Sequence, residues 1–169
     1  MPIPGITVRP ATPEDYGQIR RITVDSYRSA GYFDSPDHPY LAVLADVEHR
    51  ARHADVRVAE RDGQIIGALA IVEPGGHYAD VAVAGELEFR MLAVDPAVQR
   101  SGAGRAMVEA VISYARSRPE IDAVSLTSLM DMTAAHRLYE SLGFSRVPER
   151  DWVVPEEDIQ LLVFRLPLR

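Results

Sequence analysis

The 169-residue sequence contains no cysteine. This absence excludes disulfide bonds, thiolate metal ligands and a cysteine nucleophile, and it is typical of a cytoplasmic protein, which is the location we expect. No uninterrupted apolar run approaches the length of about 18 residues that a membrane-spanning helix needs, so we expect no membrane span. The first residues, Met1 to Gly5, lack the basic and apolar segments of a secretory signal.

Basic residues are scarce relative to acidic ones: 18 Lys and Arg stand against 25 Asp and Glu, for a formal net charge of −7. A nucleic-acid-binding domain normally carries a basic face, so we expect no nucleic-acid partner. The acidic balance favours a cationic ligand such as an amine, through an attraction that salt weakens. With 47% apolar and 25% charged residues the composition is that of a globular protein, and we expect one domain over residues 1–169.

Several catalytic and binding motifs are also missing from the sequence. It has neither the G-x-x-x-x-G-K-[ST] phosphate loop nor the G-x-S-x-G nucleophile elbow. His49 and His53 have the i, i+4 spacing of helical metal ligands, but the H-E-x-x-H pattern is absent and two arginines lie between them. We therefore expect no metal site.

The most informative segment is Gln99-Arg100-Ser101-Gly102-Ala103-Gly104. It lies between a strand-like run that ends at Asp95-Pro96 and a helix-like run that begins at Arg105. The N–H groups at a helix start have no intrahelical partner and can bind phosphate, and glycine lets phosphate approach the backbone closely. The dinucleotide pattern G-x-G-x-x-G is not completed, because Met107 holds the third glycine position. The segment therefore predicts a pyrophosphate-binding loop flanked by arginines.

Hydrophobic periodicity and turn signals predict the element order β-α-α-β-β-β-α-β-α-β-β. The strands are expected at residues 6–9, 56–60, 65–72, 86–94, 123–129, 144–147 and 160–166, and the helices at about 13–29, 41–52, 105–118 and 135–142. Hairpins and helical crossovers are both present in this order, so the sheet should contain parallel and antiparallel pairs.

Gln99, Gly102 and Gly104 fill the pattern Q/R-x-x-G-x-G/A, which belongs to the acetyl-CoA site of the GNAT superfamily of N-acetyltransferases. The preceding residues 92–96 resemble the fourth strand of that family with its Val-x-Pro exit. Residues 135–144, A-H-R-L-Y-E-S-L-G-F, resemble its A-x-x-L-Y-x-x-L-G-F segment. The resemblance implies an α/β (α+β) fold with a mixed, mostly antiparallel central sheet flanked by helices, and the predicted element order agrees with it over nearly the whole chain.

The same resemblance implies an enzyme that transfers an acetyl group from acetyl-CoA, its co-substrate, to a primary amine of a small molecule or peptide. Backbone groups of Val94 would pair with the pantetheine arm, and a main-chain N–H near a bulge around Met91 and Leu92 would polarise the thioester carbonyl. The implied cofactor-binding residues are Leu92, Ala93, Val94, Gln99, Arg100, Ser101, Gly102, Ala103, Gly104, Arg105 and Tyr139.

Glu88 and Glu86 are the candidates for the base that deprotonates the amine, because residues two apart on a strand share one face. The resemblance places the family's common base at Glu88 and that of other members at Glu86, so both remain open. It also makes Tyr139 the candidate general acid, near the CoA sulfur. Met132 stands where the family often has an asparagine, which leaves that contact open.

A non-catalytic acyl-CoA-binding or regulatory domain is the main alternative function, and dinucleotide binding is a weaker one. The family resemblance places the acceptor pocket at aromatic and acidic residues that suit an amine on an apolar body. These residues are Tyr32, Phe33, Asp34, Asp37 and Tyr40, with the loop at 75–85. The resemblance also suggests a homodimer, although no residue specifies one.

Overall fold

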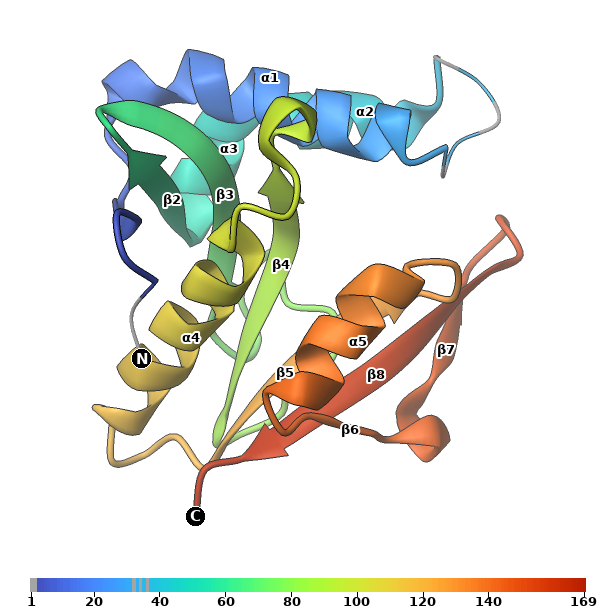
Figure 1. The fold of residues 1–169 in the computed structure, drawn as a ribbon. Helices are drawn as coiled ribbons and strands as arrows, with labels where there is room; N and C mark the ends of the chain where they lie inside the picture. Colours follow the sequence, from blue (N-terminus) through green and yellow to red (C-terminus); the bar gives the residue numbers. More distant parts are fainter. Residues whose placement is uncertain (1–2, 32, 34, 36) are drawn as a thin grey trace. The chain divides into compact units, whose positions relative to one another are not determined.

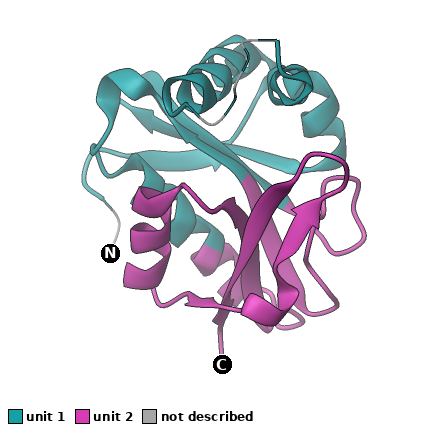
Figure 2. Ribbon diagram, turned by 90° about the vertical axis from the view of Figure 1, so that its right-hand side faces the viewer, with its two compact units in different colours: residues 1–71, 91–111 teal, residues 72–90, 112–169 magenta. Residues whose placement is uncertain are grey.

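The computed structural model describes residues 3–31, 33, 35 and 37–169, and Figure 1 shows its elements. The chain divides into two compact units, coloured separately in Figure 2. Unit 1 comprises residues 1–71 and 91–111, and unit 2 comprises residues 72–90 and 112–169. Strands β3 (Gln64–Val72) and β4 (Glu86–Val94) and helix α4 (Ala103–Arg116) each have residues in both units.

Unit 1 is built from antiparallel strands with helices on both faces. Ile19 of α1 and Val47 of α3 pack with Val58 and Ala68 of the strands in one buried cluster. Gly67 precedes Ala68 on the same strand and lies close to α4. A Cβ added to Gly67 would be 2.6 Å from the Cε atom of Met107. Because neighbouring strand residues point to opposite faces, α4 covers the face opposite to α1 and α3. The further elements of this unit are β1 (Thr7–Pro10), η1 (Pro13–Asp15), α1 (Tyr16–Ser29), α2 (Pro39–Ala45), α3 (Val47–His53), β2 (Asp55–Arg61), β3 (Gln64–Val72) and η2 (Pro96–Val98).

Local sequence explains two features of unit 1. Asp62 and Gly63 both have positive φ angles, 52° and 77°, as the predicted two-residue hairpin between β2 and β3 requires. The single helix predicted for 41–52 is wrong: the structure has two short helices separated at Asp46. The Asp46 carboxylate accepts a hydrogen bond from the His49 N–H at 3.2 Å, so it caps α3 and ends the α2 hydrogen-bonding pattern.

Unit 2 continues the sheet through β5 (Ala123–Leu129), β8 (Ile159–Pro167), β6 (Ser145–Arg146) and β7 (Trp152–Val154), with α5 (Thr133–Ser141) and η3 (Pro148–Arg150). The strand order is β1-β2-β3-β4-β5-β8-β6, with β7 also paired to β8. β4 pairs with β5 in parallel, whereas β1–β2, β2–β3, β5–β8, β6–β8 and β7–β8 are antiparallel. The mixed, mostly antiparallel sheet with flanking helices confirms the predicted fold class.

The two faces of the unit 2 sheet differ in chemistry. On one face Tyr139 of α5 packs against Phe89 of β4 and Phe164 of β8, with ring centroids 5.9 and 5.7 Å apart. The opposite face carries Glu86 and Glu88, both buried. A buried polar face needs internal hydrogen-bond partners, and these define the candidate site described below.

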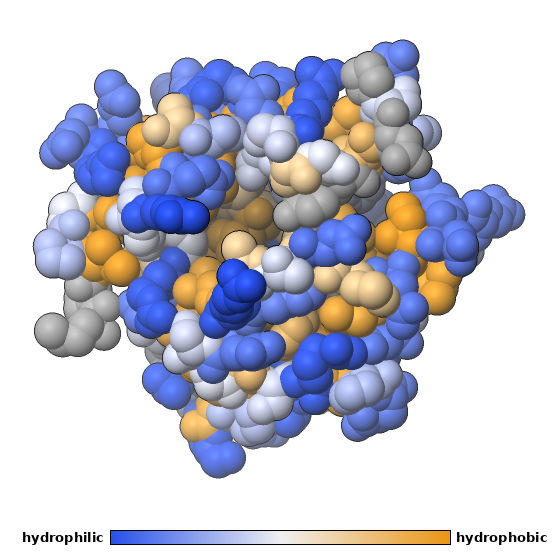
Figure 3. Space-filling view, turned by 45° about the vertical axis from the view of Figure 1, so that its right-hand side comes forward, coloured by the Kyte–Doolittle hydropathy of each residue, from blue (hydrophilic) through white to orange (hydrophobic). Residues whose placement is uncertain are grey.

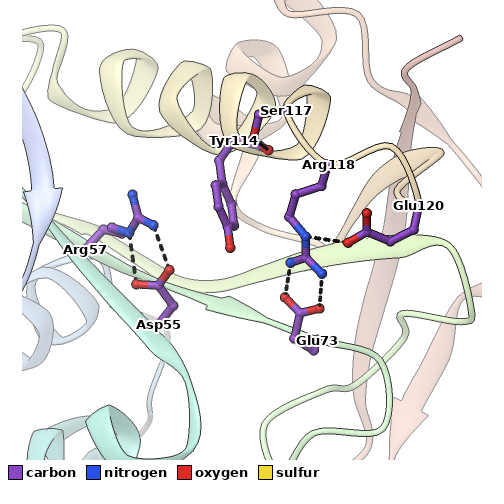
Figure 4. Close-up of polar contacts among 7 residues, drawn as sticks. All are labelled: Asp55, Arg57, Glu73, Tyr114, Ser117, Arg118 and Glu120. Carbon is purple, nitrogen blue, oxygen red and sulfur yellow. Dashed lines mark hydrogen bonds and ion pairs between the residues drawn. The ribbon is translucent and has the colours of Figure 1, made fainter.

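A charged cluster holds the C-terminal end of α4 within unit 2. Arg118 forms ion pairs with Glu73 at 2.6 Å and Glu120 at 2.7 Å, and its guanidinium lies 5.6 Å from the Tyr114 ring centroid (Figure 4). A local pair, Asp55–Arg57 at 2.7 Å, lies on β2 in unit 1.

On the face shown in Figure 3, hydrophilic side chains dominate and apolar ones occur in smaller groups between them. The large apolar side chains that are exposed include Val43, Val83, Met130 and Val153. Within the described part of the chain, no helix has the length and apolar character that crossing a membrane would require.

Candidate active site

The predicted phosphate loop connects β4 to α4 in unit 1. β4 ends at Val94, and the Asp95 carboxylate accepts a hydrogen bond from the Ala97 N–H at 3.0 Å, which starts the short helix η2. After this turn Arg100 and Gly102 have φ angles of 64° and 90°. Left-handed residues turn the chain sharply into α4 and fit glycine better than any other residue.

The start of α4 presents its backbone donors as the loop hypothesis requires. The helix begins at Ala103, and the Ala106 N–H donates to the Gly102 carbonyl at 2.9 Å. Donors upstream of Ala106 have no acceptor within the helix. Ala103 is held locally, because its N–H donates to the Ser101 hydroxyl at 3.3 Å. The next N–H group, that of Gly104, lies in the first turn of α4, where an anion would be favourably placed.

Two side chains fasten this loop to its surroundings. Gln99 donates through Nε2 to the Val94 carbonyl at 3.2 Å, so the loop is tied back to the end of β4. Arg21 of α1 forms an ion pair with Asp95 at 2.9 Å, and this contact lowers the pKa of Asp95. The sequence did not reveal Arg21, because no local pattern links residues 74 positions apart.

Met91 has a φ angle of 57° within β4. A left-handed residue interrupts the regular pleat, and it lies where the family resemblance places a bulge. Its side chain is buried, so only the redirected backbone can serve a ligand here. The irregularity re-aims the N–H groups around Met91 and Leu92, the groups expected to polarise a carbonyl.

In unit 2 the parallel pairing of β4 with β5 runs over three residue pairs, from Glu86↔Ala123 to Glu88↔Ser125. β4 continues to Val94 and β5 to Leu129. Glu88 and Ser125 are therefore the last pair before the two strands stop pairing. Both predicted base candidates belong to this short ladder, and both are buried.

The Glu88 carboxylate is held by consecutive backbone amides of the loop before β4. Its Oε1 accepts from the N–H groups of Asp80, Val81 and Ala82 at 3.0, 3.1 and 3.0 Å, and its Oε2 from Asp80 at 3.2 Å. Burial raises the pKa of Glu88, and the nearby Asp80 charge adds to the rise, whereas the three backbone hydrogen bonds oppose it. Asp80 itself forms an ion pair with Arg90 at 3.1 Å.

Glu86 lies in a different environment, between two guanidinium groups. It forms ion pairs with Arg150 at 2.9 Å and Arg165 at 2.8 Å, and accepts from the Val83 N–H at 3.3 Å. Burial raises the pKa of Glu86, but the hydrogen bonds from both arginines outweigh it, so the pKa is lowered overall. Mutual repulsion between the two glutamates, which their spacing suggests, is therefore not what controls either pKa.

Tyr139 is buried on the α5 face of the same sheet, in a cluster with Phe89, Phe144 and Phe164. Since Glu88 and Phe89 are neighbours on β4, Tyr139 and Glu88 lie on opposite faces of the strand. Met132, at the family's frequent asparagine position, precedes α5, and its sulfur accepts a hydrogen bond from the Ser128 hydroxyl at 3.5 Å.

The structure thus places the predicted residues in two groups. Leu92 to Arg105 lie in unit 1, whereas Glu86, Glu88 and Tyr139 lie in unit 2. Residues that the sequence did not reveal complete the second group, namely Ser125, Arg150, Arg165 and the amides of 80–82. A signal for Ser125 existed, because the alternation of polar residues in 123–129 marks one face of a strand.

Of the predicted acceptor-pocket residues, Tyr32 and Asp34 lie outside the described residues. Phe33 and Tyr40 belong to an aromatic cluster with Tyr27, at ring-centroid distances of 6.4 Å for Tyr27–Phe33 and 6.0 Å for Phe33–Tyr40. The His49 and His53 rings lie at an angle of 44° to each other, with centroids 4.5 Å apart. Among the residues that the structure describes, no group of three or more His, Cys, Asp or Glu is placed to hold a metal ion.

Comparisons with known proteins give the family and the fold of this chain. The model of the "Acetyltransferase (GNAT) family" matches residues 16–144. The mycothiol acetyltransferase of Cellulomonas flavigena is 29% identical over 153 residues, covering 85% of this chain and 41% of the relative. The chain spans about two fifths of the length of this relative and of other curated relatives that it matches.

Two solved structures share the fold. Spermidine N-acetyltransferase from Vibrio cholerae, in complex with CoA and spermine, has a TM-score of 0.69 at 16% identity, covering 97% of this chain and 96% of that one. The yncA protein of Salmonella typhimurium, solved with its cofactor acetyl-CoA, has a TM-score of 0.69 at 23% identity, covering 98% and 95%.

Proposed function

Because the chain belongs to the acetyltransferase (GNAT) family, we propose that it transfers the acetyl group of acetyl-CoA to a primary amine of a small molecule or peptide. The loop geometry supports this co-substrate: a left-handed Gly102, a helix start at Ala103 and the first-turn N–H of Gly104 suit a pyrophosphate. Val94 and the irregular backbone at Met91 would take the pantetheine arm and the thioester carbonyl.

The observation that carries the catalytic part of the proposal is the environment of Glu88. An amine nucleophile must lose a proton, and a carboxylate serves as base near neutral pH when its pKa is raised. Burial raises the pKa of Glu88, whereas two arginines lower that of Glu86. Glu88 therefore takes the proton of the ammonium group, and Glu86 has a structural part.

Acetyl-CoA supplies the activated thioester, and the protein supplies the proton transfers. Glu88 accepts one proton from the ammonium group, and the neutral amine attacks the carbonyl carbon. As the carbon–sulfur bond breaks, the Tyr139 hydroxyl gives a proton to the sulfur. The second proton that the nitrogen loses as the amide forms restores the Tyr139 hydroxyl. A net charge of −7 favours cationic acceptors such as the polyamine in the complex of the Vibrio cholerae protein.

The test is release of free CoA from acetyl-CoA with a panel of polyamines, amino acids and peptides. We expect Glu88→Gln to lower kcat/KM by roughly 10²–10⁴-fold with little change in the affinity for CoA. The matched variant Glu86→Gln should retain turnover at neutral pH, because the Glu86 carboxylate takes no proton in the proposed reaction. If CoA binds but no amine in the panel is acetylated by the wild type, the non-catalytic acyl-CoA-binding domain becomes the better description.

A further inference from the structure

The polar face of unit 2 contains a buried hydroxyl with no hydrogen-bond partner. Ser125 is fully buried, and its Oγ is one of two buried side-chain polar atoms in the described residues that lack a partner. Polar atoms in protein interiors are nearly always hydrogen-bonded, so an exception at a proposed active site points to a bound group. The other such atom, Thr23 Oγ1, lies on α1 in unit 1.

Strand register places Ser125 beside the proposed base. Ser125 pairs with Glu88 of β4 in the parallel ladder and with Arg165 of β8 in the antiparallel ladder. Paired residues on adjacent strands point to the same face, and adjacent strands lie about 4.8 Å apart. The hydroxyl therefore stands between the Glu88 carboxylate and the stem of Arg165, whose guanidinium reaches Glu86 at 2.8 Å.

The two oxygens of Glu88 are unequally occupied. Oε1 accepts three backbone hydrogen bonds, whereas Oε2 accepts one, the longer bond of 3.2 Å from Asp80. A carboxylate offers about four acceptor positions in total, so Oε2 has the remaining capacity. The backbone amides of residues 80–82 thus occupy mainly Oε1 and leave acceptor capacity on Oε2 for the reaction.

We propose that Ser125 is a positioning residue that holds a water molecule against Glu88 Oε2, through which the acceptor amine is deprotonated. The inference rests on the proposed role of Glu88. The Ser125 hydroxyl donates to the water oxygen, and the water donates to Oε2. The water then takes a proton from the ammonium group while giving one of its own to Glu88, so one N–H bond breaks, one O–H bond forms, and the water is regenerated.

The adjacent residues of β5 show that this face is built for polar partners. Thr127, two residues along the same face, accepts a hydrogen bond from the Trp152 indole at 3.3 Å, so its hydroxyl is already used. Ser128, on the opposite face, donates to the Met132 sulfur and contacts His136 Nε2 at 3.1 Å. Among these three hydroxyls of β5, Ser125 is the one without a protein partner.

The Ser125 hydroxyl holds the water that donates a hydrogen bond to the ionised Glu88 carboxylate, and this hydrogen bond stabilises the charged form. Removal of the hydroxyl should therefore raise the pKa of Glu88. Other charges bear on that carboxylate as well, and they must stay unchanged in the test. The titratable and charged groups that face it are Asp80, Glu86, Arg90, Arg150 and Arg165.

The experiment compares Ser125→Thr with Ser125→Val. Threonine and valine have nearly the same shape and both suit a strand, but valine has a methyl group where threonine has a hydroxyl. We expect Ser125→Val to lower kcat by about tenfold and to move the acid limb of kcat/KM to higher pH by about half a unit or more. Ser125→Thr should stay near the wild type, and the KM for acetyl-CoA should not change in either. Ser128→Ala is the control on the opposite face and should leave the acid limb in place.

A second measurement separates this inference from the proposed function. Carbon-13 NMR titration of the Glu88 carboxyl reports its pKa without any turnover, and Ser125→Val should raise that pKa relative to Ser125→Thr. Equal pKa values in the two variants would overturn the role of Ser125, even if Glu88→Gln abolishes activity. If Glu88→Gln retains full activity, the proposed base is wrong, whereas the titration still decides whether Ser125 and Glu88 are coupled.

Discussion

Glu86 and Glu88 lie two positions apart on one strand, yet their pKa values are shifted in opposite directions. Both are buried, yet Glu88 takes its hydrogen bonds from neutral backbone amides and Glu86 from two guanidinium groups. Burial therefore dominates at Glu88 and raises its pKa, while ion pairing dominates at Glu86 and lowers it. Opposite shifts in neighbouring carboxyls indicate different tasks, one in proton transfer and one in structure.

At the residue scale, Glu86→Gln should destabilise the protein at neutral pH by about 2 kcal/mol, below the usual cost of a broken buried pair because both arginines can reach water. The folded-state pKa of Glu86 is lowered, so its stabilisation is present above the unfolded pKa and is lost as pH falls through the folded pKa. Urea unfolding should show the largest difference from wild type near pH 7, shrinking towards acid pH. A difference that is the same at all pH values would contradict the ion-pair explanation.

Residue-level prediction from sequence was possible where a short pattern carries the chemistry. The spacing of Gln99, Gly102 and Gly104 identifies the loop, and two glutamates at i, i+2 identify the base candidates. It could not assign their roles, because Arg150 and Arg165 lie 64 and 79 positions from Glu86. Partners so distant in sequence leave no periodic signal.

At the element scale, the structure departs from the elements predicted by hydrophobic periodicity at turns and helix caps. Asp62 and Gly63 have positive φ angles and form the hairpin between β2 and β3, and Gly143, with a φ angle of 99°, follows the end of α5. Asp46 sits within an apolar helical pattern, and its capping of α3 outweighs the periodicity. The short strand β7 was missed because three residues give too little alternation, and only its pairing with β8 defines it.

The loop before α4 offers a test of element geometry. Gly102 has a φ angle of 90°, so Gly102→Ala should destabilise the fold by about 1–2 kcal/mol and weaken CoA binding by distorting the helix start. Gly17→Ala is the matched control, because Gly17 lies in α1 with nothing within 4 Å of an added Cβ, and it should be neutral or stabilising by up to about 1 kcal/mol. Denaturation and calorimetric titration with CoA provide both readouts. Wild-type affinity in Gly102→Ala would place the phosphates elsewhere.

At the scale of the whole molecule, the sequence predicted the family and the mixed sheet, and it predicted the element order apart from the division into α2 and α3 and the added strand β7. The division into two units was not expected from a composition that suggests one domain, and the single domain over residues 1–169 stays a prediction. The residues proposed to bind the CoA phosphates belong to unit 1, whereas those proposed to transfer protons belong to unit 2. Sequence patterns identify the residues of each proposed role, but they do not show which distant segments contact one another to form a unit.

Ligand binding supplies the test at this scale. CoA at about 100 times its dissociation constant should stabilise the folded protein by about 2.7 kcal/mol, which raises Tm by about 5–10 °C for a chain of this size. NAD at the same concentration should leave Tm unchanged, because the third glycine of the dinucleotide pattern is replaced by Met107. Differential scanning calorimetry measures both. Stabilisation by NAD and not by CoA would favour a dinucleotide-binding protein.

Three residue pairs join β4 to β5, whereas seven join β5 to β8. A short parallel ladder opens at a smaller free-energy cost than a long antiparallel one, so amide hydrogens of residues 86–88 should exchange sooner than those of β8. The proposed chemistry is thus located at a strand pairing that opens more easily than the neighbouring β5–β8 pairing. Substrates that enter and products that leave would meet the protein where two strands separate at a small free-energy cost.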